Sequence, residues 1–206
     1  MIKIKALIMA GGKATRMNNI EKPLIKICGT TMIERILNAL KNTKCIEDVY
    51  ITTSKNTKNT EILLKTLGYK TITTSGEDYV EDLKNTIIKL NIKDPILVLP
   101  SDLPLITPNT IEQLINIYIQ NNSPPTTTFY IPLQLLKTKI RTNYIEQINN
   151  IKVIPSGISI IKGSYITQNV IPQINIIVEN TELSVNVNTL LDIKIAQSIL
   201  CKRNNK

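Results

Sequence analysis

The fold class of this 206-residue chain is decided by residues 7–17, which read LIMAGGKATRM. An apolar run ends at Gly11 and Gly12, and the cations Lys13 and Arg16 follow. Glycines directly after a buried strand let the backbone approach a phosphate, whose charge the cations can balance. An ordinary strand–turn–helix connection with surface cations has the same features. The stretch matches neither the GxxxxGK[ST] P-loop nor the GxGxxG dinucleotide motif.

Short apolar runs alternate along the chain with segments of helical periodicity. We expect strands at 4–9, 49–53, 70–74 and 96–99. We expect helices after Thr31, which has capping-box spacing with Glu34, around 62–67, at 79–90, from Thr107-Pro108 onward and at 189–202. This alternation predicts an α/β, Rossmann-like fold, with a mainly parallel central sheet and helices on both faces. Ligands bind at the carboxyl ends of such strands, where LIMAGG and VLPSD (98–102) lie. We find no internal repeat or clear linker, and expect a single domain over residues 1–206.

The net charge is +9, and the lysines are scattered without a long basic block. We therefore expect a solvated basic surface that meets an anionic small molecule, with no nucleic acid as partner. No apolar run is long enough to span a membrane, and no signal peptide is visible. These features favour a cytoplasmic protein without stable membrane insertion.

The cysteine and histidine content restricts the chemistry. Cys28, Cys45 and Cys201 are far apart and odd in number, which indicates neither a disulfide framework nor a zinc site and fits a reducing compartment. The chain contains no histidine. Ser–His and Cys–His nucleophiles, histidine metal sites and phospho- or guanylyl-histidine intermediates are therefore excluded.

Lys22 and Asp102 are candidate site residues with competing structural interpretations. Lys22 precedes Pro23, which favours an extended backbone and would hold the cation near the first loop; a plain loop lysine is the alternative. Asp102 follows an apolar strand end, where a carboxylate could hold Mg²⁺ bound to phosphates or could simply close a turn.

The segment before the last helix offers a weaker metal candidate. Thr189 and Asp192 have the spacing of a capping box, which is a sufficient structural reason for both. Metal binding by Asp192 or Asn188 is the alternative.

Taken in order, four segments carry a family resemblance. They read LIMAGGKATRM (7–17), EKPLIKICGTTMIERIL (21–37), VLPSDLPLI (98–106) and VNVNTLLDIKIA (185–196). Together they resemble the nucleotidyltransferase superfamily that activates sugar phosphates and cofactors. With TSGEDYVEDL (74–83) and VIPSGISII (153–161), the chain is most similar to the archaeal GTP:adenosylcobinamide-phosphate guanylyltransferases. Ala14 departs from the family, which usually has glycine there.

The resemblance implies guanylyl transfer from GTP to adenosylcobinamide phosphate, with Mg²⁺ as cofactor and pyrophosphate as second product. The partners would be GTP and a phosphorylated corrinoid, and a homodimer is compatible with this assignment. A molybdenum-cofactor or sugar-1-phosphate nucleotidyltransferase and a non-catalytic GTP-binding module remain alternatives. The attacking group is already a phosphate anion, so a protein without histidine can catalyse the step through positioning and charge neutralisation.

The resemblance also assigns site residues. The catalytic set is Lys13, Arg16, Lys22 and Asp102. The nucleotide-binding set is Leu7, Met9, Ala10, Gly11, Gly12, Lys13, Arg16, Lys22, Thr74, Ser75, Gly76 and Asp102. In this set, Thr74–Gly76 would read the guanine base, although Ser75 and Asp78 also suit a helix cap. Acceptor binding is assigned to Pro155, Ser156 and Gly157, which the sequence alone predicts to be a turn, and metal binding to Asp102 and Asp192.

Overall fold

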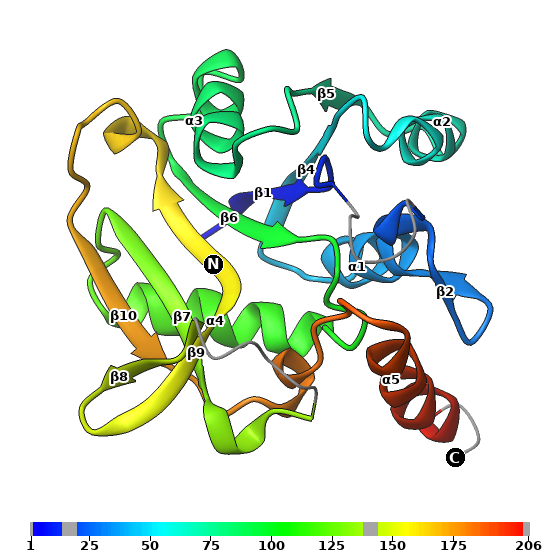
Figure 1. Ribbon diagram of the computed structural model, residues 1–206. Helices are drawn as coiled ribbons and strands as arrows, with labels where there is room; N and C mark the ends of the chain where they lie inside the picture. Colours follow the sequence, from blue (N-terminus) through cyan, green and yellow to red (C-terminus); the bar gives the residue numbers. More distant parts are fainter. Residues whose placement is uncertain (1, 14–19, 138–143, 204–206) are drawn as a thin grey trace.

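The protein, described by a computed structural model over residues 2–13, 20–137 and 144–203, is built around one large sheet (Figure 1). The sheet has eight strands, seven of them in the order β10-β7-β9-β6-β1-β4-β5, while β8 pairs with β9. Their bounds are β1 Ile4–Met9, β4 Ile46–Thr53, β5 Thr71–Thr73, β6 Pro95–Pro100, β7 Thr126–Pro132, β8 Glu146–Ile148, β9 Ile151–Lys162 and β10 Gln173–Ile177.

Parallel pairing dominates the half of the sheet that carries the glycine motif. Strand β1 is parallel to both β4 and β6, and β4 is parallel to β5. Strand β9 runs antiparallel between β6 and β7, and β10 is parallel to β7. The prediction of a mainly parallel sheet is therefore confirmed, with β9 as the one described strand that runs opposite to its neighbours β6, β7 and β8.

Helices cover both faces of the sheet because β1 is buried on both sides. The helices are α1 Met32–Lys41, α2 Lys58–Thr66, α3 Tyr79–Lys89, α4 Pro108–Gln120 and α5 Leu190–Arg203. Leu7 shares a core cluster with Leu83 of α3, whereas Ile8 shares another with Ile36 of α1 and Ile111 of α4. Alternate residues of a strand point to opposite faces, so this division follows from the strand period. In the described part of the chain, no helix has the length and apolar character required to cross a membrane.

Local capping signals set the helix starts, with one correction. Thr31 and Glu34 form the capping box expected before α1, and the Thr107 hydroxyl accepts from the Thr110 amide at the start of α4. Helix α3 is capped by Asp78, whose carboxylate accepts from the Glu81 amide. Ser75 does not cap this helix, because its amide and hydroxyl bind another carboxylate described below.

The segment Pro155–Gly157 is not a turn, as the sequence alone predicted, but part of strand β9. The register between β7 and β9 shifts here, from Thr128↔Ser159 to Tyr130↔Pro155, so β9 carries extra residues in a bulge. Gly157 has φ +82°, and an added Cβ would lie 3.0 Å from Pro100 Cγ at the end of β6. The bulge therefore requires glycine and packs against the strand end that faces the candidate site.

A disulfide joins Cys28 and Cys201, contrary to the sequence prediction that the cysteines form no disulfide framework. Cys28 lies in the turn between β2 (Lys26–Ile27) and β3 (Thr30–Thr31), and α5 packs beside this hairpin (Figure 1). The Cα atoms are 5.9 Å apart across a sequence separation of 173 residues. Such a pairing depends on how α5 docks, which cysteine spacing does not encode. Cys45 is buried and is a free thiol.

The disulfide should stabilise the docked C-terminal helix. Replacement of Cys201 by serine should lower the free energy of unfolding by about 2–4 kcal/mol, because the cross-link restricts the unfolded chain. Denaturant unfolding with and without reductant measures this change, and reductant should not affect the variant. Detection of three free thiols in the native, unreduced protein would contradict the pairing.

Candidate active site

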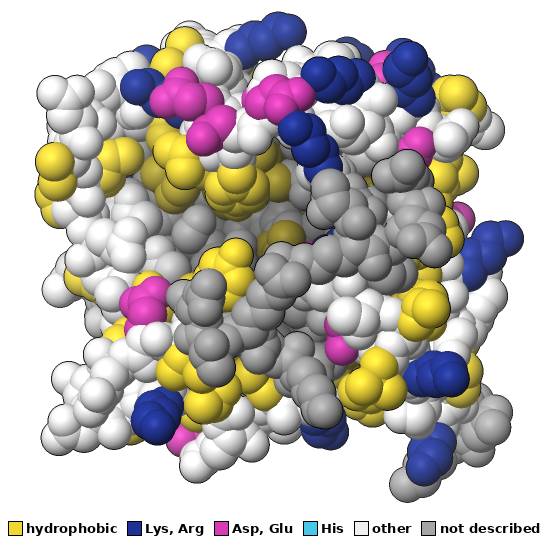
Figure 2. Space-filling view, in the orientation of Figure 1, with side chains coloured by type: hydrophobic (Ala, Val, Ile, Leu, Met, Phe, Trp, Pro, Cys, Tyr) yellow, Lys and Arg dark blue, Asp and Glu magenta, His cyan; other side chains and the backbone are white. Residues whose placement is uncertain are grey.

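A cavity of 310 Å³ lies at the carboxyl ends of β1, β4, β5 and β6. Figure 2 shows it as a hollow at the centre of one face, with apolar side chains along its upper edge and acidic and basic side chains above them. Its lining consists of Met9, Ala10, Gly11, Gly12, Lys13, Lys22, Pro23, Thr52, Thr74, Gly76, Glu77, Tyr79, Asp82, Pro100, Ser101 and Asp102. The cavity therefore lies at the carboxyl ends of the strands, where ligands bind in sheets of this kind.

The two glycines serve different needs. An added Cβ on Gly11 would lie 3.2 Å from Ser54 Cβ and 3.2 Å from Thr74 Oγ1, so Gly11 permits close packing of three strand ends. On Gly12, an added Cβ would meet no described atom within 4 Å, so this backbone faces open space. The Ser54 hydroxyl donates to the Gly11 carbonyl at 2.7 Å and fixes the loop. The result is an anchored loop with one exposed peptide beside the cavity.

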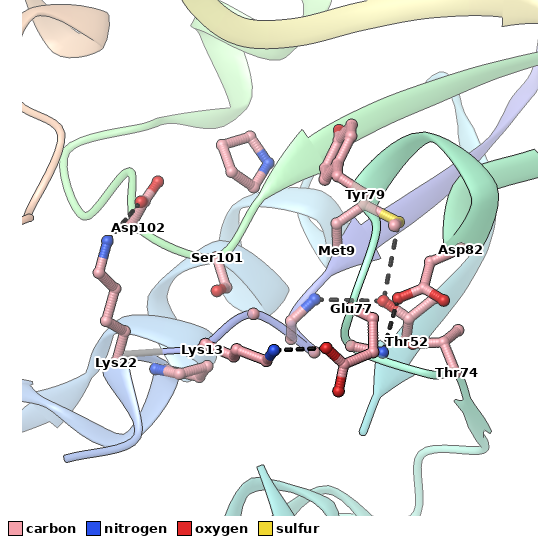
Figure 3. Close-up of a pocket in the computed structure, with 16 residues that line it drawn as sticks. Met9, Lys13, Lys22, Thr52, Thr74, Glu77, Tyr79, Asp82, Ser101 and Asp102 are labelled. Carbon is pink, nitrogen blue, oxygen red and sulfur yellow. Dashed lines mark hydrogen bonds and ion pairs between the residues drawn. The ribbon is translucent and has the colours of Figure 1, made fainter. Parts of the chain in front are cut away.

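Lys22 is held between two oxygen atoms from distant segments. Its ammonium donates to Asp102 Oδ2 at 3.2 Å (Figure 3) and to Asn188 Oδ1 at 2.7 Å. Lys22 begins the 3-10 turn η1 (Lys22–Leu24), so its backbone is more tightly turned than the extended form that Lys-Pro predicts. The turn closes because the Leu24 and Ile25 amides donate to the carbonyls of Glu21 and Lys22. The expected outcome, a fixed cation beside the first loop, is confirmed.

Asp102 is a mostly buried carboxylate, with 14% of its side chain exposed and one oxygen unsatisfied. Its Oδ1 is buried and has no hydrogen-bond partner in the described chain. Burial raises the pKa of Asp102, although the Lys22 ammonium acts in the opposite direction. Because buried polar groups are nearly always paired, a free carboxylate oxygen beside a cavity is suited to a cation supplied with the ligand.

Lys13 reaches the opposite side of the cavity mouth. Its ammonium pairs with the carboxylate of Glu77 (Figure 3), which also binds Lys55 at 2.8 Å. The hydrogen bond from Lys13, followed by that from Lys55, lowers the pKa of Glu77 to about 2. These side chains are about half exposed, so the pair is screened and can exchange for phosphate oxygens at low cost.

The predicted base loop is organised by Asp82 of α3. Its Oδ1 accepts from the Ser75 amide at 3.0 Å and from the Ser75 hydroxyl at 2.8 Å, while Oδ2 accepts from the Gly76 amide at 2.8 Å. Burial raises the pKa of Asp82, but these hydrogen bonds outweigh it and hold the pKa below its usual range. Gly76 has φ +69°, and an added Cβ would lie 2.5 Å from Ser54 Oγ. Any larger residue at position 76 would therefore displace this loop.

Tyr79 and Asp82 lie at the cavity but were not singled out from sequence as binding residues. Burial of the phenol, with Asp102 nearby, raises the pKa of Tyr79 to about 12, so its hydroxyl stays protonated near neutral pH. Half of the Tyr79 surface is nevertheless exposed. Their position in the sequence could have indicated this, because both belong to the first turn of the helix that follows the predicted base loop.

Several predicted residues lie away from the cavity lining. Leu7 is fully buried in the core, and Ser75 is turned toward Asp82. Residues Pro155–Gly157 approach the site through Pro100, which Gly157 contacts. Arg16 and Ala14 fall outside the described residues.

Asp192 is buried and acts as a helix cap. Its Oδ2 accepts from the Asn188 amide at 2.9 Å and from the Thr189 amide at 2.8 Å, as the capping interpretation predicted. It does not belong to the described cavity lining. Asn188, the other candidate in this segment, is the residue that contacts Lys22.

The fold and the cavity together are those of a nucleotidyltransferase. Residues 6–131 match the family model of the MobA-like NTP transferase domain. The chain belongs to this family.

Two guanylyltransferases of this family are similar to the chain over different lengths. The chain is 33% identical over 202 residues to the adenosylcobinamide-phosphate guanylyltransferase of Methanocaldococcus jannaschii, covering 96% of this chain and 97% of the relative. The molybdenum cofactor guanylyltransferase of Shewanella woodyi is 27% identical over 116 residues, covering 55% of this chain and 56% of the relative. The resemblance to the corrinoid guanylyltransferases is therefore confirmed.

Solved structures support the fold assignment. A CMP:2-keto-3-deoxy-manno-octonic acid synthetase complexed with CTP aligns with TM-score 0.73 and 15% identity, covering 98% of this chain and 100% of that one. A 4-diphosphocytidyl-2C-methyl-D-erythritol synthase aligns with TM-score 0.70 and 12% identity, covering 97% and 99%. At these identities the likeness concerns the fold alone.

The Asp82 contacts predict a specific loss of nucleotide binding. In an Asp82→Asn variant, the amide nitrogen would face backbone and hydroxyl donors of the base loop, and GTP affinity should fall by roughly tenfold. Calorimetric titration measures this affinity, with Glu81→Gln as the control because Glu81 is an exposed neighbour on the same helix. Equal GTP affinity in a folded Asp82→Asn protein would contradict the assigned role of the loop.

Proposed function

We propose that this nucleotidyltransferase moves GMP from GTP to adenosylcobinamide phosphate and releases pyrophosphate. The observation that carries the proposal is the 33% identity to an adenosylcobinamide-phosphate guanylyltransferase along almost the entire length of both chains. The molybdenum cofactor guanylyltransferase of Shewanella woodyi matches little more than half of this chain. The regions outside the shared family domain therefore favour the corrinoid acceptor.

In the proposed donor complex, the triphosphate lies over the Gly11–Gly12 backbone. The open space beside Gly12 supports close approach of phosphate oxygens. Lys13 then exchanges the Glu77 carboxylate for the departing β- and γ-phosphates, with Arg16 assigned by resemblance to the same role. The Thr74–Gly76 loop reads the guanine edge, in the conformation that Asp82 holds.

The side-chain oxygens near Lys22 are suited to bind Mg²⁺. Asp102 Oδ1 is buried and unsatisfied, and carboxylate and amide oxygens are hard ligands. Asn188 Oδ1, which accepts from Lys22 in this structure, would become available when the ammonium turns to the α-phosphate. Asp192 is less suited, because its Oδ2 is already occupied by two amides and its contact with the Asn188 amide instead orients that residue. When bound, Mg²⁺ would neutralise phosphate charge and align the phosphates for displacement. Substrate phosphates and water would complete its coordination.

The chemical step requires no general base from the protein. A phosphate oxygen of the acceptor attacks the α-phosphorus of GTP, and the bond from that phosphorus to the oxygen bridging to the β-phosphate breaks. A new phosphoanhydride forms, and the electron pair leaves with pyrophosphate. Lys22 balances charge at the α-phosphate, and this preorganised charge should contribute on the order of 10²–10³ in rate.

Incubation of the protein with Mg²⁺, α-labelled GTP and adenosylcobinamide phosphate tests the proposal. Labelled adenosylcobinamide-GDP and pyrophosphate should appear in equal amounts, with ATP, CTP and UTP as poor donors. Molybdopterin and sugar 1-phosphates serve as parallel acceptors. Transfer to one of these, with none to the corrinoid, would replace the proposed acceptor.

The proposed ligands predict a distinct metal response. Chelation should abolish transfer, and Mg²⁺ should restore it. An Asn188→Ala variant should need roughly tenfold more Mg²⁺ for half-maximal rate, because one ligand is lost. A Mg²⁺ titration of the initial rate measures this requirement, with Asn85→Ala as the control, because Asn85 is exposed on α3 and does not line the cavity. An unchanged Mg²⁺ requirement would remove Asn188 from the metal site.

A further inference from the structure

Glu21, which directly precedes Lys22, binds the start of helix α2 rather than the cavity. Its Oε1 accepts from the Asn59 amide at 2.9 Å and from Asn59 Nδ2 at 3.0 Å. Its Oε2 accepts from the Thr60 amide at 2.7 Å and from the Thr60 hydroxyl at 2.6 Å. Each carboxylate oxygen of Glu21 thus accepts two hydrogen bonds.

This contact replaces the usual local cap of α2. Thr57 occupies the N-cap position but makes no side-chain capping bond in the described structure, because its hydroxyl is bonded with Ser54. The amides that a cap would satisfy belong to the second and third residues of the helix, and these are the ones that Glu21 binds. The carboxylate also complements the positive end of the helix dipole.

The consecutive residues Glu21 and Lys22 therefore bind the turn η1 to two different parts of the structure. Glu21 holds it to α2, which follows β4, and Lys22 extends from it toward Asp102 at the end of β6 and Asn188 before α5. Pro23, which is buried and also lines the cavity, restricts the same backbone. Because the turn is held in this way, the position of the Lys22 Cα, from which the side chain extends, is fixed.

We propose that Glu21 is a positioning residue that sets the catalytic placement of Lys22 by tying its turn to the N-terminus of α2. The inference rests on the proposed function of Lys22 at the α-phosphate. Glu21 does not line the cavity, so its effect on the reaction passes through Lys22.

A Glu21→Gln variant is the appropriate change, because it preserves side-chain length and removes the charge. One of the paired acceptors becomes an amide nitrogen facing two donors, so two of the four hydrogen bonds are lost. The turn should shift or fluctuate, and kcat should fall by roughly 10- to 100-fold with little change in the KM for GTP. Rates are normalised to the folded fraction measured by circular dichroism.

Glu61→Gln is the matched control. Glu61 lies in the first turn of the same helix and pairs with Lys65 at 2.6 Å. This variant also removes a carboxylate from the start of α2, but it leaves the Lys22 turn untouched. It should keep the wild-type kcat.

A double-mutant cycle separates positioning from general stability. If Glu21 acts through Lys22, Glu21→Gln should cause no further loss of kcat in a Lys22→Ala background, where the residual rate is measured. A purely structural contribution would reduce kcat by the same factor in both backgrounds, and that result would overturn the proposal.

A second measurement needs no turnover. Amine-selective labelling followed by peptide mapping reports the reactivity of Lys22, which should rise in Glu21→Gln and stay at the wild-type value in Glu61→Gln. Unchanged Lys22 labelling in Glu21→Gln would overturn the positioning role. Increased labelling in a protein that transfers no guanylyl group would support the positioning and reject only the proposed function.

Discussion

The Lys22 ammonium, shared between Asp102 and Asn188, is the interaction on which the rest of the site depends. Its partners lie 80 and 166 residues away in sequence, so the contact forms only when the first loop, the end of β6 and the segment before α5 have all reached their places. Asp102 is mostly buried and its Oδ1 is unsatisfied, so this carboxylate would be costly to keep charged without a cation. Lys22 therefore serves both the folded state and the proposed transfer.

A similar lysine–carboxylate pair lies at the cavity mouth, where Lys13 pairs with Glu77. In both places a cation that could bind phosphate is neutralised by a carboxylate of the protein itself. The two pairs differ in environment, since the Lys13–Glu77 pair is half exposed whereas the Lys22–Asp102 pair is mostly enclosed. Exchange with phosphate should be easy at Lys13, and the Lys22 pair should respond mainly to a cation that arrives with the nucleotide.

Periodicity and local motifs predicted much of the fold. The apolar run of β1, the Thr31–Glu34 capping box and the Thr107-Pro108 helix start need only neighbouring residues, and all were confirmed. Predictions failed where long-range packing decides. The bulge at Gly157 depends on pairing with β7, and the Cys28–Cys201 disulfide depends on docking of α5. In the site, the family resemblance singled out Gly11, Gly12, Lys22 and Asp102, all of which line the cavity, whereas the residue patterns alone left Lys22 and Asp102 open. The Asp82 and Glu21 contacts require the folded chain. The single-domain organisation and the absence of a nucleic-acid partner remain predictions.

The most direct measurement is a crystal structure of the protein with Mg²⁺ and a GTP analogue that resists transfer at the α-phosphate. The account predicts the triphosphate over Gly11 and Gly12, a cation on Asp102, the Lys22 ammonium at the α-phosphate and the Glu21 contacts to α2 intact. A nucleotide bound elsewhere, with Lys22 still bridging Asp102 and Asn188 and no cation on Asp102, would contradict it.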